Sequence, residues 1–204
     1  MARDSTGTLD EQGQALLDAA TELLTTEGPE ALTVRRIAST AGCSTMGLYS
    51  RFGGKDGVVE RLWLDGFTRL RAAIAASPAT ADPLRDLETI NIAYRQWALA
   101  NATSYGIMFS RAVPEFIPSP EAKALAAGTF AIVVDAVRRA QEKGHFPEAE
   151  PHDIAHTLWA MVHGFTSLEI AGMTPVPERL ATRFAIGNQA IIAGLEKTGG
   201  RPGT

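Results

Sequence analysis

The sequence contains a single cysteine, Cys43, among its 204 residues. One cysteine cannot form an internal disulfide bond or a cysteine-based metal cluster, so we expect a protein of a reducing, cytoplasmic environment. Long apolar runs are also missing, because no stretch without Asp, Glu, Lys or Arg exceeds fifteen residues. Residues 1–9 lack the apolar segment of a secretory signal. These absences argue against a membrane partner and against export.

Basic residues are not in excess. The chain has 19 Lys and Arg against 23 Asp and Glu, a net charge of -4, which by itself argues against nucleic acid as a partner. The distribution of charge favours the opposite conclusion, because residues 31–55 contain no acidic residue and four basic ones: Arg35, Arg36, Arg51 and Lys55. A local cationic surface on an acidic protein is what phosphate binding at one site requires.

Sequence patterns of catalysis are absent as well. There is no Gly-x-Ser-x-Gly elbow, no His-Glu-x-x-His and no glycine pattern of a phosphate loop. These motifs position a nucleophile, a zinc ion or a nucleotide. We therefore expect neither enzymatic activity nor a cofactor.

Apolar residues recur with helical spacing along nearly the whole chain, and no stretch shows the sustained period of two that marks a strand. The sequence therefore predicts an all-α protein of about nine helices. The first helix begins with a capping box at Thr8 and Glu11 and ends at Gly28. The others are expected over residues 33–41, 44–52, 56–76, 84–103, 104–112, 120–143, 151–171 and 178–196.

Residues 33–52 form two short helices separated by a turn that contains Gly42. Ala38 is small enough to lie where the two helices cross, and Gly42 supplies the positive φ of the turn. With Leu48 and Phe52 directed inward, the second helix presents outward Thr45, Met46, Ser50 and Arg51, with Tyr49 at the edge. This arrangement predicts a helix-turn-helix that offers side chains to a DNA groove and two helix N-termini to phosphates.

The run TVRRIASTAGCSTMGLYSRFGGKD, Thr33 to Asp56, closely resembles the DNA-binding domain of the TetR family of bacterial transcriptional regulators. The resemblance covers about residues 10–65. It implies a homodimer on a palindromic double-stranded DNA operator, with the third helix of each protomer in successive major grooves. The DNA-binding residues expected from the motif and the resemblance are Thr33, Arg35, Arg36, Ser44, Thr45, Met46, Gly47, Tyr49, Ser50, Arg51 and Lys55.

Two positions depart from the family pattern. Cys43 stands where a branched aliphatic residue is usual. At position 46, where relatives commonly have a small residue, this chain has Met46, and Gly47 follows it. The base preference therefore cannot be carried over from a relative.

A second, shorter segment, LWAMVHGF at residues 158–165, resembles the Trp-His-Gly signature of one class of TetR C-terminal domains. It implies a helical ligand-binding and dimerisation domain, so we expect a helix-turn-helix domain at 1–55, a connecting helix at 56–76 and the second domain at 77–204. The last two long helices would pair with those of the partner protomer. The expected dimer residues are Phe165, Leu168, Phe184, Ile191 and Leu195.

Aromatic residues gather on the helices after residue 60. Most of them are expected to fill the core, but Tyr and Trp also carry polar groups, and ligand pockets in helical domains are lined in this way. The expected ligand-binding residues are Trp63, Phe67, Tyr94, Trp97, Tyr105, Met108, Phe109, Phe130, Trp159 and His163.

Three histidines, His152, His156 and His163, fall within about 40° of one another on an ideal helix. They could form a metal-binding stripe, but the sequence offers no fourth strong ligand, so surface positions for the first two and a packed position for His163 are favoured. Cys43 is expected between two helices, where a thiol is inert.

Together these features predict a ligand-responsive transcriptional regulator, a repressor released from its operator by a small, largely apolar effector. The alternative that the acidic charge leaves open is a ligand-binding or protein-interaction module that no longer binds DNA.

Overall fold

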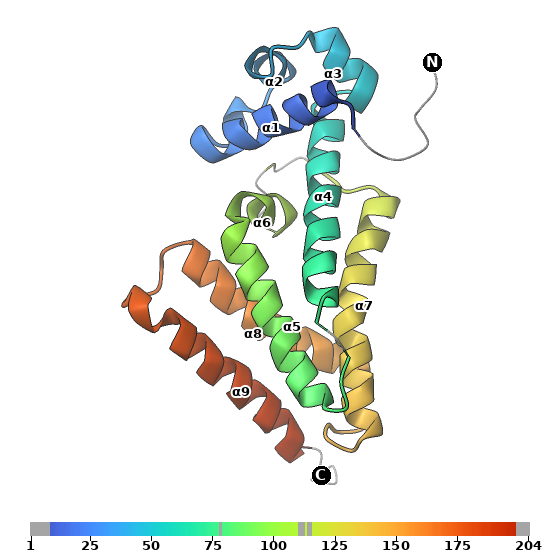
Figure 1. Ribbon diagram of the computed structural model, residues 1–204, viewed down its shortest axis with the longest axis vertical. Helices are drawn as coiled ribbons and strands as arrows, with labels where there is room; N and C mark the ends of the chain where they lie inside the picture. Colours follow the sequence, from blue (N-terminus) through green and yellow to red (C-terminus); the bar gives the residue numbers. More distant parts are fainter. Residues whose placement is uncertain (1–8, 78, 110–112, 114–115, 199–204) are drawn as a thin grey trace. The chain divides into compact units, whose positions relative to one another are not determined.

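The computed structural model describes residues 9–77, 79–109, 113 and 116–198 (Figure 1). Over these residues the chain forms nine α-helices and two short 3-10 turns and has no strand, which confirms the all-α prediction. None of the described helices combines the length and the apolar character of a membrane span. The helices are α1 (Glu11–Thr26), α2 (Val34–Thr40), α3 (Thr45–Phe52), α4 (Lys55–Ala75), α5 (Pro83–Ala100), α6 (Ala102–Phe109), α7 (Pro120–Glu142), α8 (Pro151–Ile170) and α9 (Leu180–Thr198), with the 3-10 turns η1 (Pro29–Ala31) and η2 (Pro177–Arg179).

The chain divides into two compact units. The first comprises Met1–Gly66 and Thr103–Lys123, and the second comprises Phe67–Ala102 and Ala124–Thr204. Both α4 and α7 therefore contribute residues to each unit. The domain ranges 1–55, 56–76 and 77–204 divide the chain by expected function, and they stay a prediction.

In the first unit, α1, α2 and α3 pack on one another in pairs. The apolar stripe of α1 supplies Leu16, Ala20 and Leu23 to their core, and all three are buried. The N-cap of α1 is Asp10, whose carboxylate accepts a hydrogen bond from the Gly13 amide at 2.7 Å. The capping box expected at Thr8 and Glu11 is therefore not what starts the helix, and Thr8 itself lies outside the described residues.

The turn between α2 and α3 has the predicted geometry. Gly42 adopts a φ of +63°, and Ala38 is buried where the two helices meet. The Cys43 amide donates to the Ala38 carbonyl at 2.8 Å, which closes the turn. Cys43 is half-buried, not fully enclosed between the two helices as expected.

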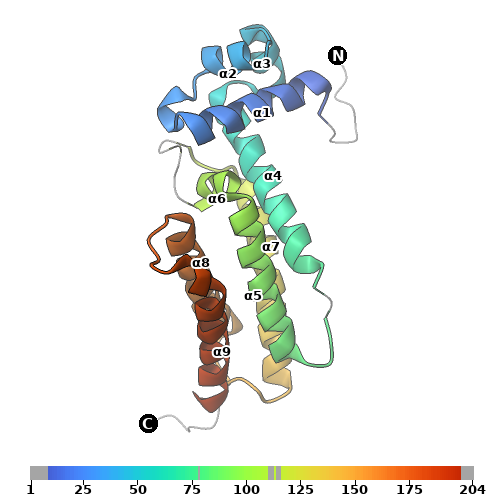
Figure 2. The same ribbon diagram turned by 60° about the vertical axis from the view of Figure 1, so that its left-hand side comes forward.

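In the second unit, α5 packs against α8 and α9, and α8 and α9 run side by side (Figure 2). Leu87, Ile90, Leu158 and Val162 fill the space between them and are buried. Apolar burial of this kind contributes about 25 cal/mol per Å² removed from water.

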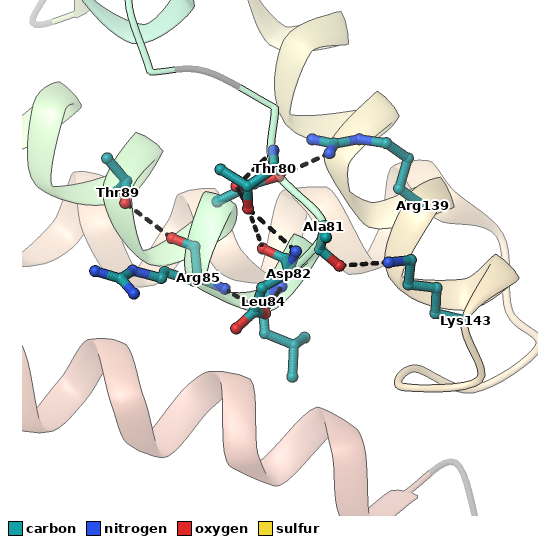
Figure 3. A network of polar contacts seen from close by, with 9 residues as sticks. Thr80, Ala81, Asp82, Leu84, Arg85, Thr89, Arg139 and Lys143 are labelled. Carbon is teal, nitrogen blue, oxygen red and sulfur yellow. Dashed lines mark hydrogen bonds and ion pairs between the residues drawn. The ribbon is translucent and has the colours of Figure 1, made fainter.

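Polar residues of α5 connect this helix to its neighbours at three levels. The Asp86 carboxylate, 3% exposed, accepts hydrogen bonds from the Thr80 amide at 2.9 Å and hydroxyl at 2.7 Å and from Arg139 of α7 at 2.7 Å. Figure 3 shows its two partners, Thr80 before α5 and Arg139 on α7. Further along, the Asn91 amide nitrogen donates to the Asn188 side chain of α9 at 2.7 Å. Arg95 forms a two-pronged ion pair with Glu169 of α8 at 2.8 and 2.6 Å.

Candidate functional site

The outer face of α3 is exposed, and two large side chains stand out on it. Met46 is 74% exposed and Tyr49 is 53% exposed, while Leu48 on the opposite side is fully buried. Thr45 and Ser50 are exposed on the same outer surface. The helix therefore presents one apolar, one aromatic and two hydroxyl side chains to the surroundings, a set able to contact base edges and phosphates.

A cleft of about 560 Å³ lies beside this face, between the start of α2 and α3. Its walls are formed by Thr33, Val34, Arg35, Thr45 and Tyr49. Four of these five were predicted as DNA-binding residues, and the structure brings them together although up to sixteen positions separate them in the chain. The cleft therefore combines groups that can donate hydrogen bonds to a phosphate oxygen: a hydroxyl, a guanidinium, a phenol and the N-terminus of a helix.

Both helices in this region are capped by hydroxyl side chains. The Thr33 hydroxyl accepts from the Arg36 amide at 3.3 Å at the start of α2. The Ser44 hydroxyl accepts from the Gly47 amide at 3.0 Å at the start of α3. Both residues were predicted to mark phosphate-accessible helix starts, and each remains exposed.

The four predicted cations are not equivalent. Arg36 pairs with Glu27 at 2.6 Å, and Arg51 pairs with Asp10, its Nη2 lying 2.5 Å from Oδ2. The hydrogen bond from Arg51 lowers the pKa of Asp10 to about 2, so this carboxylate is charged at neutral pH. Arg35 is exposed in the cleft, and Lys55 is half-buried at the first position of α4. The charge of two of the four cations is thus balanced within the chain.

A small apolar cavity of about 210 Å³ also lies in the first unit. Three predicted ligand-binding residues line it, namely Trp63 of α4 with Met108 and Phe109 of α6. The remaining lining residues, which sequence reasoning missed, are Ile107, Val113, Phe116, Ile117 and Pro118. The signal in the sequence was the segment 113–118, which contains two prolines and three apolar residues around Glu115 and has no helical period. The side chains that line the cavity are apolar or aromatic and would contact the apolar part of a small ligand, while polar atoms also contribute to the cavity surface.

The other predicted ligand-binding residues divide between the units. Tyr105 is buried in the first unit and contacts Phe109 in a tilted arrangement with ring centres 5.0 Å apart. The remainder belong to the second unit: Phe67, Tyr94, Trp97, Phe130, Trp159 and His163. Of these, Phe67, Tyr94 and Trp97 are buried, as the expectation of core filling for most aromatics implies.

The remaining aromatic rings of the second unit form a row along α7 and α8. Phe130 lies 6.3 Å from Trp159, and Trp159 lies 4.9 Å from His163, between ring centres. The Tyr94 hydroxyl and His163 Nδ1 are 3.0 Å apart. Burial lowers the pKa of His163, which favours the neutral ring.

The predicted histidine stripe does not gather into a set of metal ligands. His152 and His156 lie 6.5 Å apart between ring centres, and the His156 ring donates to the His152 carbonyl at 2.9 Å. His163 faces Tyr94 instead. Within the described residues no group of three His, Cys, Asp or Glu could hold a metal ion.

The predicted dimer residues differ in exposure. Leu168 of α8 is 49% exposed, but Phe184 of α9 is only 3% exposed, because it packs against Phe165 and under the Arg95 guanidinium. Phe184 therefore belongs to the interior of the chain, which corrects its expected place on the surface. Ile186, which the sequence analysis missed, is 61% exposed on α9.

Family models match both parts of the chain. Residues 16–62 match the model described as "Bacterial regulatory proteins, tetR family". Residues 87–189, about half of the chain, match the model described as "Tetracyclin repressor-like, C-terminal domain". No curated protein shows significant similarity to the sequence.

Solved structures share the fold. A protein of unknown function from Rhodococcus sp. RHA1 is 22% identical, with 95% of this chain and 100% of that chain covered and a TM-score of 0.76. The regulatory protein SCO4313 is 27% identical, with coverages of 90% and 98% and a TM-score of 0.75. The TetR family transcriptional regulator PfmR from Thermus thermophilus is 23% identical, with coverages of 85% and 97% and a TM-score of 0.68.

Two observations lead to one conclusion: the helix-turn-helix has an exposed α3, and the two family matches together span most of the described helices. The chain belongs to the TetR family of bacterial regulatory proteins and is a ligand-responsive, DNA-binding transcription regulator.

Proposed function

We propose that the protein is a repressor that binds a palindromic operator as a homodimer and leaves it when a small apolar effector binds. The observation that carries the DNA half of this proposal is the exposed outer face of α3 beside the cleft that holds Thr33, Arg35 and Tyr49. Two such helices, one from each protomer, would enter major grooves one helical turn apart, about 34 to 36 Å.

Within this interface the contacts fall into two classes. Thr33, Arg35, Tyr49 and Lys55, with the start of α3 at Ser44, would hold phosphates and fix the register on the duplex. The base edges would be contacted by the outer side chains of α3, with Gly47 allowing a close approach: Thr45, Met46 and Ser50. Met46 can contact a thymine methyl, because its exposed side chain is apolar and unbranched.

Replacing Lys55 by alanine tests the phosphate class. Loss of one phosphate contact should reduce the dependence of log K on log salt by about 0.9 and weaken all duplex sequences alike. The measurement is fluorescence anisotropy with a duplex selected by the wild-type protein from a random pool, at several salt concentrations. Lys123→Ala on α7 removes an exposed lysine outside the proposed interface and should leave the slope unchanged. An unchanged slope for Lys55→Ala would refute the phosphate role.

The effector half of the proposal rests on the apolar cavity of about 210 Å³ between Trp63 and the α6 residues. A cavity of this size takes a compact molecule or the end of a longer one. One of its lining residues, Trp63, belongs to α4, the helix that follows the helix-turn-helix, so an effector in contact with Trp63 would favour a different position of α4. The ligand acts by binding the DNA-incompetent arrangement better than the competent one.

A cavity-filling variant tests this half. Ile107→Phe should occupy the cavity and leave operator affinity within about threefold of wild type, while release by indole or 1-hexanol, the two probes titrated against the complex, is lost. Ile92→Phe on the exposed side of α5 adds the same ring outside the cavity and should leave release intact. Should Ile107→Phe be released as readily as wild type, the effector site lies elsewhere.

We further propose that the C-terminal domain belongs to the Trp-His-Gly class. Its support is the contact of Trp159 with His163 and of His163 with Tyr94, which together build one packed corner of the second unit.

A further inference from the structure

Arg51 lies on α3, the helix proposed to read the DNA, yet its guanidinium is held by other parts of the chain. Nε lies 2.9 and 3.1 Å from the two carboxylate oxygens of Asp10, and Nη2 lies 2.5 Å from Oδ2. Nη2 also donates to Gln12 at 2.8 Å, and Nη1 donates to the Gly47 carbonyl at 3.2 Å. All three guanidinium nitrogens thus have partners within the chain.

Asp10 is itself fixed in place. It is the N-cap of α1, and the carboxylate oxygen that receives Nε also accepts from the Gly13 amide at 2.7 Å. The bond from Arg51 therefore connects α3 to a carboxylate that the backbone of α1 already orients. The two residues are 41 positions apart in the sequence.

The position of Arg51 around α3 decides what this bond can control. On an ideal helix Arg51 and Tyr49 fall on opposite flanks, about 160° apart, with Leu48 between them on the buried side. Tyr49 faces the cleft toward α2, and Arg51 faces the start of α1. Leu48 is the only fully buried side chain that α3 contributes among the described residues. Phe52, one turn later on the same face, is only half-buried, so apolar packing leaves the rotation of this eight-residue helix about its own axis incompletely fixed.

We propose that Asp10 and Arg51 act as a positioning pair that fixes the rotation of α3 against α1, and thereby decides which side chains of α3 face the bases. Arg51 then acts through the orientation of Thr45, Met46 and Ser50 rather than by holding a phosphate. This proposal rests on the proposed DNA interface and replaces the expected phosphate contact of Arg51 with a contact inside the protein.

The test uses the full-length protein and two duplexes, one selected by the wild-type protein from a random pool and one of unrelated sequence. Asp10→Asn keeps a good N-cap and a similar shape but removes the charge that pairs with Arg51. We expect about tenfold weaker binding to the selected duplex, unchanged or slightly tighter binding to the unrelated one, and an unchanged salt slope. Asp18→Asn on the exposed side of α1 makes the same charge change away from Arg51 and should preserve selectivity.

Arg51→Gln and the double variant Asp10→Asn/Arg51→Gln complete a cycle. If the two residues act through each other, the double variant loses no more selectivity than either single variant. A fall of about 0.9 in the salt slope for Arg51→Gln would show that Arg51 holds a phosphate and would overturn the proposal. Tighter binding of Asp10→Asn to the selected duplex would also overturn it, because Asp10 would then be a competitor of DNA for Arg51.

The outcome is separable from that for the interface as a whole. If Lys55→Ala and the Asp10 variant both leave binding to either duplex unchanged, the DNA surface itself is misassigned. If Lys55→Ala weakens binding but the Asp10 and Arg51 variants leave binding to both duplexes unchanged, the proposed DNA interface is supported and the proposed positioning pair is wrong. Circular dichroism and the melting temperature of each variant identify any loss of the folded state, and the salt slope is a readout that stability alone does not move.

Discussion

Single residues at the junction of α3 and α4 decide how closely these helices approach. Gly57 lies in the first turn of α4, and a Cβ atom built there would come within 1.7 Å of the Phe52 carbonyl oxygen. No real contact is so short, and the atom in the way belongs to the backbone, so it cannot move by a change of rotamer. The residue at 57 therefore has to be glycine for α4 to begin where it does.

Gly57→Ala should lower the free energy of unfolding by about 2 kcal/mol or more, since the junction must shift to admit the methyl group. Urea unfolding followed by circular dichroism measures the change. Gly128→Ala is the matched control in α7, where the added Cβ would lie 3.6 Å from the nearest atom, an ordinary contact. It should be neutral or stabilising by up to about 1 kcal/mol. Equal effects of the two variants would contradict the steric argument.

At the scale of elements, α5 is joined to its neighbours by polar contacts along much of its length. Asp86 accepts hydrogen bonds from Thr80, in the segment that precedes α5, and from Arg139 of α7. Asn91 and Arg95 then reach α9 and α8. Apolar packing tolerates sliding of one helix along another better than such directional contacts do, so these residues fix the register of the second unit.

Replacing Asp86 by asparagine should destabilise the protein by about 2 to 3 kcal/mol at pH 7, because Arg139 and Thr80 lose a charged acceptor in a buried place. The control is Asp135→Asn, on the same helix as Arg139. It removes a carboxylate from an ion pair with Arg138 at the surface, where the Arg138 side chain is 52% exposed and the Asp135 side chain 67%. That change should cost less than about 0.5 kcal/mol. Chemical denaturation of both variants measures the difference.

The contribution of Asp86 to the stability of the folded protein should also depend on pH. Burial raises its pKa, but the hydrogen bonds from Thr80 and the ion pair with Arg139 outweigh burial and lower the pKa below its ordinary value of 3.8. A carboxyl group with a lowered pKa in the folded state stabilises that state above the ordinary pKa and loses this effect as the pH falls through the lowered one. The stability difference between wild type and Asp86→Asn should therefore be constant from pH 7 to about 5 and shrink below about 4. A difference that grows in acid would refute the assignment.

At the scale of the whole molecule, charge and assembly act together. With a net charge of -4 per chain, the proposed dimer carries 2 × (-4) = -8 and would repel DNA at long range. Its binding would then depend on the local cations and on two half-sites held by one dimer. Leu168 of α8 and Ile186 of α9 are exposed apolar residues, and we propose that a second copy packs on them.

Leu168→Glu combined with Ile186→Glu should convert the dimer to monomers at micromolar concentration, because charged groups would be buried in the interface. Sedimentation velocity measures the mass, and operator affinity should fall about 100-fold or more as the second half-site is lost. Ile92→Glu, on an exposed position of α5 that is 45% accessible, should remain dimeric. A double variant that stays dimeric would place the interface elsewhere.

Much of this architecture could be predicted because its causes are local. The hydroxyl caps at Thr33 and Ser44 and the glycine turn at Gly42 each depend on backbone groups within four residues. Helical periodicity is equally local, so the number of helices and the inward direction of Leu48 follow from short windows of sequence.

Other features were decided only when distant segments met. Nothing near Arg51 in the sequence indicates that Asp10 would take its guanidinium, and nothing near Phe184 indicates that Arg95 and Phe165 would cover it. The cavity residues Val113, Phe116, Ile117 and Pro118 lie in a segment whose sequence has no period from which a direction could be inferred. In each case the partner is selected by how whole helices pack, a free energy summed over many weak contacts between segments far apart in the chain.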